Sequence, residues 1–158
     1  MDFKKGDIEG VIVKKLTKNI DERGWLVEIF RKDEIKSDVM PAMGYVSLTL
    51  PGIVRGPHEH VYQTDIFAFI GPSNFKVILW DNRKNSKTYK NKMEIYGGVD
   101  NPLIVIIPPG VVHGYKNIGI ESGLVYNLPN KLYRGEGKKE EVDEIRHEAN
   151  PASPFKFE

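Results

Sequence analysis

The sequence contains no cysteine, no long apolar run and almost no excess charge, and each absence excludes a class of protein. Without cysteine there are no disulfides and no thiolate metal sites. No apolar segment approaches the roughly 18 residues of a membrane-spanning helix, and no apolar stretch of the kind found in signal peptides follows the first residues. The formal net charge is +1, which gives no reason to expect a nucleic-acid or membrane partner. We therefore expect a soluble cytoplasmic protein, in which a local pair of arginines could still hold an anion.

Patterns of long helices are also scarce, and short apolar, β-branched stretches dominate instead. They recur at the spacing typical of an all-β sandwich or barrel, with proline- and glycine-containing turns between them. Residues 1–158 are expected to form one domain. The predicted strands are Val11–Val13, Trp25–Phe30, Gly44–Leu50, Asp65–Ile70, Phe75–Trp80, Lys92–Tyr96, Leu103–Ile107 and Gly123–Asn127.

Only two segments favour helix. One is a single turn over residues 31–35, and the other is the highly charged segment 136–146, which gives a short C-terminal helical segment. The final residues, 150–158, hold two prolines among small side chains, so we expect this tail to be extended or frayed.

Histidine is scarce as well, and three of the four histidines fall in two short motifs. His58 and His60 are two residues apart, which places both imidazoles on one face of a strand, and Asp65 follows. His113 comes directly after a Pro-x-Gly turn. Imidazole either binds a metal or moves a proton near neutral pH. Together the four residues make a 3-His-1-carboxylate set that suits Fe, Mn, Ni or Zn.

The same spacing resembles both halves of the cupin signature, Gly-x5-His-x-His-x4-acid followed by Pro-x-Gly-x2-His-x3-Asn. In this chain the first half runs from Gly52 to Asp65 and the second from Pro108 to Asn117. Asp65 stands where glutamate is usual. The resemblance implies a cupin-type double-stranded β-helix, that is, a jelly-roll barrel.

A second resemblance covers residues 21 to about 146. The chain is similar to the dTDP-4-dehydrorhamnose 3,5-epimerase family, whose members are cupin-fold homodimers that act on nucleotide-linked 4-keto-6-deoxy sugars. The motifs that carry the resemblance keep the family's order. They are Asp21-Glu-Arg23-Gly24-Trp25-Leu-Val-Glu28, Ser47-Leu-Thr49, Gly52-Ile-Val-Arg55-Gly56-Pro-His58, Asp81-Asn-Arg83, Ser86-Lys-Thr88-Tyr89, Ile107-Pro-Pro-Gly110-Val-Val-His113-Gly114-Tyr115, Leu124-Val-Tyr126, Tyr133 and Glu144-Ile145.

The resemblance implies proton abstraction next to a ketone, followed by return of a proton to the opposite face. No cofactor is implied, and the partner is a nucleotide-diphosphate sugar. By resemblance His58 is the base and Tyr126 the acid. The implied substrate-binding residues are Arg23 and Arg55 for the diphosphate, Glu28 and Tyr133 for the nucleobase, His113 for the sugar pocket, and Ser47.

This chain departs from the family pattern at substrate-contacting positions. Asp65 replaces the lysine that stabilises the enolate oxygen, and Met43-Gly-Tyr45 replaces a Gln-x-Asn pair. The aspartate that orients the base is missing, with Glu148 and Asn150 as the candidates to replace it. A carboxylate about 4 Å from an enolate repels it by about 4 kcal/mol at an effective dielectric of 20, which is roughly three decades in rate.

Three hypotheses follow from these patterns. The first is an epimerase-like isomerase with His58 and Tyr126 as base and acid. The second is a metal-dependent cupin isomerase or oxygenase, in which one divalent transition metal at His58, His60, Asp65 and His113 replaces the lost lysine as electrophile. The third is a sugar-nucleotide-binding cupin without catalysis. In the first hypothesis, a protonated Asp65 is a further way to avoid the repulsion.

Overall fold

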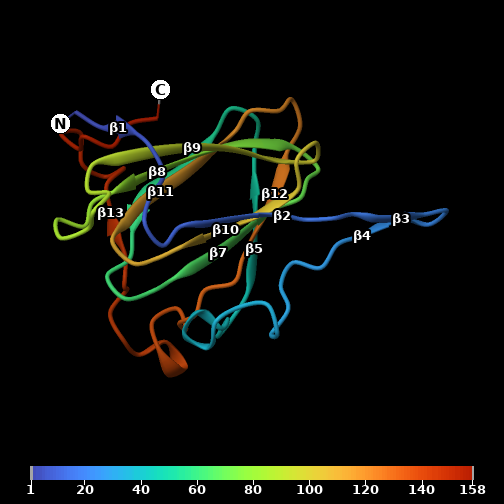
Figure 1. Ribbon diagram of the computed structural model, residues 1–158, viewed down its shortest axis with the longest axis horizontal. Coiled ribbons are helices and arrows are strands. Elements are labelled where there is room, and N and C mark those ends of the chain that lie inside the picture. Colours follow the sequence, from blue (N-terminus) through green and yellow to red (C-terminus); the bar gives the residue numbers. More distant parts are fainter. Residues whose placement is uncertain (1, 158) are drawn as a thin grey trace.

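The fold is almost entirely β, as the sequence predicts. The structure, a computed structural model, describes residues 2–157. The strands are β1 (Lys4–Lys5), β2 (Ile12–Lys15), β3 (Asn19–Asp21), β4 (Gly24–Leu26), β5 (Tyr45–Thr49), β6 (Val54–Glu59), β7 (Asp65–Phe69), β8 (Asn74–Asp81), β9 (Asn91–Gly98), β10 (Leu103–Ile107), β11 (Val111–Asn117), β12 (Gly123–Asn127) and β13 (Ile145–Arg146) (Figure 1). Two short 3₁₀ helices complete the elements, η1 (Ser37–Val39) and η2 (Glu136–Lys138).

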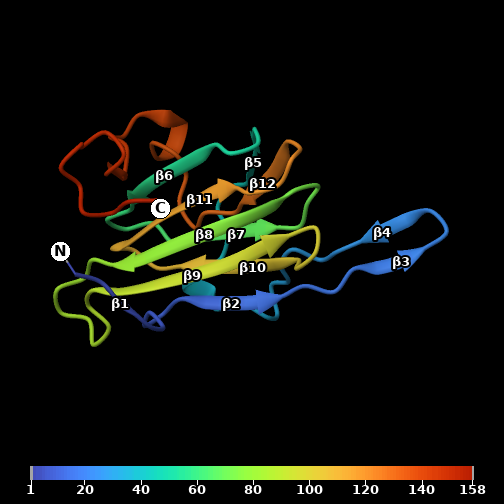
Figure 2. The same cartoon turned by 90° about the horizontal axis from the view of Figure 1, so that it is seen from above.

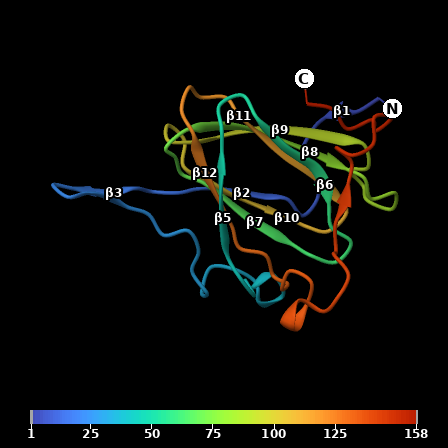
Figure 3. The ribbon, with the colours of Figure 1, turned by 180° about the vertical axis from the view of Figure 1, so that it is seen from behind.

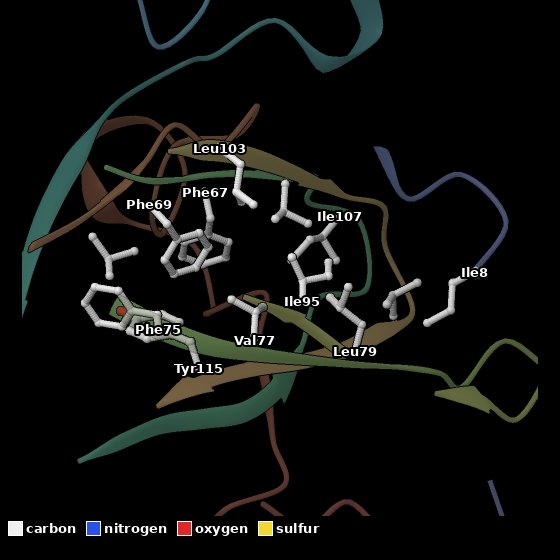
Figure 4. Packing of buried hydrophobic residues seen from close by; sticks show 13 residues of the cluster. Ile8, Phe67, Phe69, Phe75, Val77, Leu79, Ile95, Leu103, Ile107 and Tyr115 are labelled. Atoms are coloured by element: carbon white, nitrogen blue, oxygen red, sulfur yellow. The ribbon is translucent and has the colours of Figure 1, made fainter. Parts of the chain in front are cut away.

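Two sheets face each other and enclose the core. One has six strands in the order β1-β9-β8-β11-β6-β13, and the other has five in the order β2-β10-β7-β12-β5 (Figure 2). Side chains alternate along each strand, so every second residue points between the sheets. Aromatic and aliphatic side chains from both sheets meet there, including Phe67, Phe69, Phe75, Leu79 and Tyr115 (Figure 4). The space between the sheets is therefore a packed core along much of its length.

The outer face of the five-stranded sheet carries a second apolar cluster. Ile66, Ala68 and Ile104 are its fully buried centre, and residues of the segment after β4, such as Ile29 and Ile35, pack on it. This segment is irregular. We expected a strand as far as Phe30, but strand β4 ends at Leu26. The turn predicted over residues 31–35 is present, with Glu34 N–H donating to the Arg31 carbonyl oxygen.

The C-terminal region differs most from the prediction. The helical segment expected over residues 136–146 is a single 3₁₀ turn, and Gly137 in that turn has a positive φ of 65°. A short strand, β13, follows and pairs with the edge of β6. The tail is not frayed, because Phe155 is buried against Ile78 and Trp80 on the outer face of the six-stranded sheet. Apolar burial of an aromatic ring outweighs the weak local preference of a proline-rich tail.

Strands β3 and β4 form a two-stranded hairpin that projects away from the two sheets (Figures 1 and 2). Its apolar side chains are exposed, with Ile20 at 77% and Leu26 at 63%. Within residues 2–157, the structure contains no helix long and apolar enough to cross a membrane.

Candidate active site

A β-bulge between β6 and β11 aims two site residues into the barrel. Arg55 and His58 are three apart, so a regular strand would point them to opposite faces. The register pairs are His113 with His58 and Tyr115 with Arg55, so β6 has two residues between the pairs where β11 has one. The extra residue turns the strand. Both Arg55 and His58 thereby lie on the face of His113 and Tyr115, which points to the core.

Gly56 makes this bulge possible. Its φ is 83°, in the left-handed region that favours glycine, and a Cβ there would lie 2.7 Å from the His113 carbonyl oxygen. The Gly56→Ala substitution is expected to lower the free energy of unfolding by about 2–4 kcal/mol, because strain and overpacking add. Chemical denaturation measures this. Gly52→Ala is the matched control, since its φ is 74° but nothing lies within 4 Å, so it should cost only about 1 kcal/mol. Equal losses in the two variants would contradict this account of the bulge.

Three imidazoles gather at the end of the barrel that the bulge faces. The rings of His58 and His113 are 4.5 Å apart between centroids, and those of His58 and His60 are 5.7 Å apart. His113 also contacts Phe67 of the core, at 5.6 Å between ring centroids. One nitrogen from each imidazole lies within 4.8 Å of the others. The two sequence motifs therefore converge on one site, as predicted.

Asp65 is the buried centre of this cluster, and its side chain is 1% exposed. Its Oδ1 accepts hydrogen bonds from Gln63 Nε2 at 2.9 Å and Asn127 Nδ2 at 2.8 Å. Its Oδ2 lies 3.2 Å from His60 Nε2 and 3.3 Å from His113 Nε2. Burial alone would raise the pKa of Asp65, but the imidazoles of His113 and His60 outweigh it and hold the pKa well below its usual range. The lowered pKa favours the ionised carboxylate over the protonated Asp65 considered from the sequence.

His60 carries the compensating positive charge. Burial lowers the pKa of His60, but the hydrogen bond and charge of Asp65, together with the carbonyl of Asp143, raise it to about 9. The ring nitrogen Nδ1 of His60 donates to the Asp143 carbonyl oxygen. The Asp143 carboxylate in turn accepts from the backbone N–H groups of Val61, Tyr62 and Gln63 at 2.9, 3.0 and 2.9 Å. Asp143, two residues before β13, thus holds both His60 and the loop that follows it.

His58 has a different environment. Burial, and then the neighbouring His113 and His60, lower its pKa to about 2, so its imidazole is neutral at physiological pH. Its Nδ1 lies 3.8 Å from Oε1 of Glu144, and both side chains are mostly buried. A neutral imidazole with a carboxylate behind it can accept a proton and be stabilised once charged.

The carboxylate beside His58 comes from a residue that the sequence reasoning did not assign to this role. Glu148 and Asn150 were the candidates, but Glu144 takes the position because β13 pairs with β6 next to His58. The side chain of Asn150 instead accepts a hydrogen bond from the Ala152 backbone N–H. The sequence identified Glu144-Ile145 only as a match to the family. The pairing of β13 with β6, which brings Glu144 to His58, cannot be read from a linear pattern.

Among the described residues, three buried side-chain atoms lack a hydrogen bond: Asp65 Oδ2 and His113 Nε2 within the cluster, and Asn127 Oδ1 beside it. His113 Nδ1 lies 2.9 Å from the Val111 carbonyl oxygen and donates to it, so in the neutral ring Nε2 carries a lone pair. A lone pair 3.3 Å from a carboxylate oxygen is unfavourable unless a proton or a cation lies between them. His58, His60 and His113 form the group whose nitrogens could share one metal ion. Asp65 Oδ2 lies 3.2 Å from His60 Nε2 and 3.3 Å from His113 Nε2 and would add a carboxylate oxygen to this group.

Arg55 and Ser47 lie on the walls of the same space. Arg55 joins the two sheets, since its Nε donates to Thr49 Oγ1 at 3.0 Å and its Nη2 to the Leu48 carbonyl oxygen at 2.7 Å. Ser47 Oγ lies 2.9 Å from Tyr115 Oη. Both residues were predicted to bind substrate, and the structure places both on the side of the histidines.

The other predicted residues lie elsewhere within this chain. Arg23 is at the turn of the β3–β4 hairpin, with a side chain 82% exposed, and it pairs with Asp21. Glu28 pairs with Arg31 at 3.2 Å beyond the same hairpin. Tyr133 is 52% exposed after β12. Tyr126 packs in the apolar cluster on the outer face of the five-stranded sheet, so one chain does not bring it to His58.

The fold and the site together define a class of protein. A jelly-roll barrel carries a histidine cluster in one end, with a neutral histidine backed by a carboxylate, and such a site suits proton transfer to and from a bound small molecule.

Comparison with known proteins gives the family. Residues 5–145 match the family model described as dTDP-4-dehydrorhamnose 3,5-epimerase. The probable low-salt glycan biosynthesis epimerase Agl13 of Haloferax volcanii is 38% identical over 136 residues, covering 85% of this chain and 86% of that protein. The spore coat polysaccharide biosynthesis protein SpsL of Bacillus subtilis is 39% identical over 114 residues, covering 71% and 73%.

A solved structure agrees. The dTDP sugar isomerase of Desulfovibrio desulfuricans superposes with a TM-score of 0.81 at 26% identity, over 94% of this chain and 91% of that one. The chain therefore belongs to the dTDP-4-dehydrorhamnose 3,5-epimerase family, and it is a sugar epimerase of the isomerase class.

Proposed function

We propose that this protein inverts a carbon next to the ketone of a nucleotide-linked 4-keto-6-deoxy sugar, with His58 as the base. The observation that carries the proposal is the pair of His58 and Glu144, because a neutral imidazole faces the barrel with a carboxylate 3.8 Å from its Nδ1. Family membership supports the same reaction class.

The reaction needs only proton transfers. The nitrogen of His58 that faces away from Glu144 takes the proton at C3 or C5, and the electron pair of the C–H bond moves into the enolate. Glu144 stabilises the imidazolium so formed. An acid on the opposite face then returns a proton to the carbon, and the ketone re-forms. Proton exchange with solvent restores the neutral His58 and the protonated acid. Protons taken and returned balance, so the reaction requires no redox cofactor.

The protonated His60 offsets the missing lysine. Asp65 alone would repel an enolate, but His60 and Asp65 form an ion pair at 3.2 Å, so their net charge is close to zero. Arg55 adds a positive charge at the join of the two sheets and suits a diphosphate oxygen. His113 and Ser47 would line the sugar pocket, and Tyr133 would lie beside the nucleobase.

A homodimer would complete the site. Arg23 and Glu28 were predicted to bind the diphosphate and the nucleobase, yet both lie on or just beyond the projecting hairpin. Exposed apolar side chains on this hairpin, Ile20 and Leu26 among them, favour a protein partner. We infer that the hairpin inserts Arg23 next to a second copy's barrel. The cytoplasm, where activated sugars are made, is the location this reaction implies.

The direct test is proton NMR of dTDP-4-keto-6-deoxyglucose in deuterated water with the protein added. Loss of the C3 or C5 proton signal supports the proposal, and the signal lost identifies the carbon. An intact substrate with no exchange over hours contradicts it for this sugar.

Glu144 gives a sharper prediction. The Glu144→Gln substitution is expected to lower the exchange rate by about 100-fold, because the imidazolium loses a carboxylate partner at 3.8 Å. Proton NMR of samples quenched at successive times in deuterated water measures the exchange rate. Glu148→Gln is the matched control and should change the rate less than threefold. Equal effects of the two substitutions would mean that Glu144 does not assist His58.

A second candidate function is metal-dependent chemistry at the same site. It is favoured by the two buried atoms of the cluster without hydrogen bonds, Asp65 Oδ2 and His113 Nε2. His60, His113 and Asp65 would hold a divalent transition metal, with His58 as a fourth donor, and the metal would supply an electrophile for the ketone or enolate oxygen. Metal analysis of untagged protein, with thermal unfolding before and after chelation, tests this. Well under one equivalent of metal and an unchanged Tm count against it.

A further inference from the structure

Tyr45 and Tyr126 lie on neighbouring strands of the five-stranded sheet, but their side chains point to opposite faces of it. Tyr126 pairs with Val46 and Ala68 in the sheet, while its neighbours Val125 and Asn127 point to the core. Val125 belongs to the core cluster. Because side chains alternate, Tyr126 must point outward, and it packs with Ile66 and Ala68 on the outer face.

Tyr45 points the other way, into the space that holds the histidines. Its strand partner is Asn127, which faces the core. Asn127 Nδ2 donates to Tyr45 Oη at 2.9 Å and to Asp65 Oδ1 at 2.8 Å. Asp65 accepts only, so the amide must present its nitrogen to it. Both N–H groups of Asn127 are then used, and Tyr45 is left with its own O–H free to donate.

Tyr45 and His58 belong to the two sheets that face each other. Tyr45 begins β5 at the edge of the five-stranded sheet, and His58 is near the end of β6 in the six-stranded sheet. Figure 3 shows β5 and β6 diverging from the turn that joins them, and the two strands belong to different sheets, so Tyr45 and His58 come from opposite sheets of the barrel. A sugar between these sheets would have His58 toward one face and Tyr45 toward the other.

The phenol of Tyr45 is protonated near neutral pH. Burial raises its pKa; the hydrogen bond from Asn127 lowers it, and the negative charges of Asp65 and Glu144 add to the rise, to about 12. After it gives up its proton, the phenolate oxygen keeps the Asn127 N–H as a donor.

We propose that Tyr45, and not Tyr126, is the acid that returns the proton on the face opposite His58. The proposal rests on the proposed epimerase function. In this step the phenolic O–H bond breaks, a C–H bond forms at the enolate carbon, and the ketone is restored. The phenolate is stabilised by Asn127 and then takes a proton from water. The position where the family has the asparagine of its Gln-x-Asn pair thus carries a catalytic residue in this chain.

The test separates exchange from inversion in deuterated water. In Tyr45→Phe, His58 still removes the proton and returns deuterium to the same face. We expect exchange within about tenfold of wild type, while formation of the epimer falls by 100-fold or more. Tyr126→Phe should invert the sugar at close to the wild-type rate. Tyr96→Phe, on the far strand β9, is the neutral control, and Tm values verify folding.

Three results would overturn the proposal. The first is inversion at the wild-type rate in Tyr45→Phe. The second is loss of inversion in Tyr126→Phe. The third is a parallel loss of exchange and inversion in Tyr45→Phe, since that indicates a structural role. If the wild-type protein causes no exchange, the proposed epimerase function is contradicted, and the assignment of Tyr45 falls with it.

Discussion

The His58→Asn variant is expected to exchange the C3 or C5 proton of the keto sugar at least 1,000-fold more slowly than wild type. A positioned general base contributes about 10²–10⁴ in rate, and the adjacent Glu144 acts only through this imidazole. Proton NMR in deuterated water measures the loss. Asparagine keeps a polar side chain in the barrel but has no basic nitrogen.

Binding and folding supply the controls for this variant. Binding of dTDP should weaken less than tenfold, because Arg55 and the hairpin are unchanged. The Tm should stay close to wild type, since removing His58 leaves the Asp65 pair with His60 in place. Turnover that survives in His58→Asn would exclude His58 as the base.

The Asp65→Asn variant is expected to lose about 3 kcal/mol of unfolding free energy at pH 7, because it leaves the buried His60 charge without its partner. Asp65 also contacts Gln63, Asn127 and His113, so its loss affects both sheets. Urea denaturation measures the difference. Asp7→Asn, at an exposed position, is the control and should stay within about 0.5 kcal/mol.

The pH dependence follows from the direction of each shift. The raised pKa of His60, about 9, adds stability that is fully present below about pH 6.5 and is lost as the pH rises through 9. The lowered pKa of Asp65 adds stability that is present above about pH 4 and is lost on acidification. The gap between wild type and Asp65→Asn should therefore narrow between pH 7 and 10. A gap that stays constant over this range would contradict the ion pair.

Local sequence patterns predicted many of the strands and the histidine cluster. Alternation and turn residues identified eight strands, and the histidine spacing identified a cluster that the fold brings together. These signals are local or periodic, so they are readable in a linear sequence. The order of the motifs also gave the family. One domain over residues 1–158, the homodimer and the individual substrate contacts stay predictions.

The C-terminal region was the weakest part of the prediction, because long-range contacts decide its structure. A charged segment with some helical preference became β13, since the free edge of β6 offers it hydrogen bonds. The buried Phe155 then holds the tail on the six-stranded sheet. Asp143 and Glu144 reach the histidines only because of this docking, and residues about 80 positions away cannot be paired by spacing.

The sequence by itself determined the all-β class, the family and the residues that carry imidazole or carboxylate near the site. Only the tertiary structure decided which face each side chain occupies. The bulge at Gly56 turns His58 and Arg55 to the same face, and unbroken alternation in β12 sends Tyr126 outward while Asn127 orients Tyr45. A shift of one residue in strand register reverses the face of every side chain, and register is a property of paired strands, which no single strand contains.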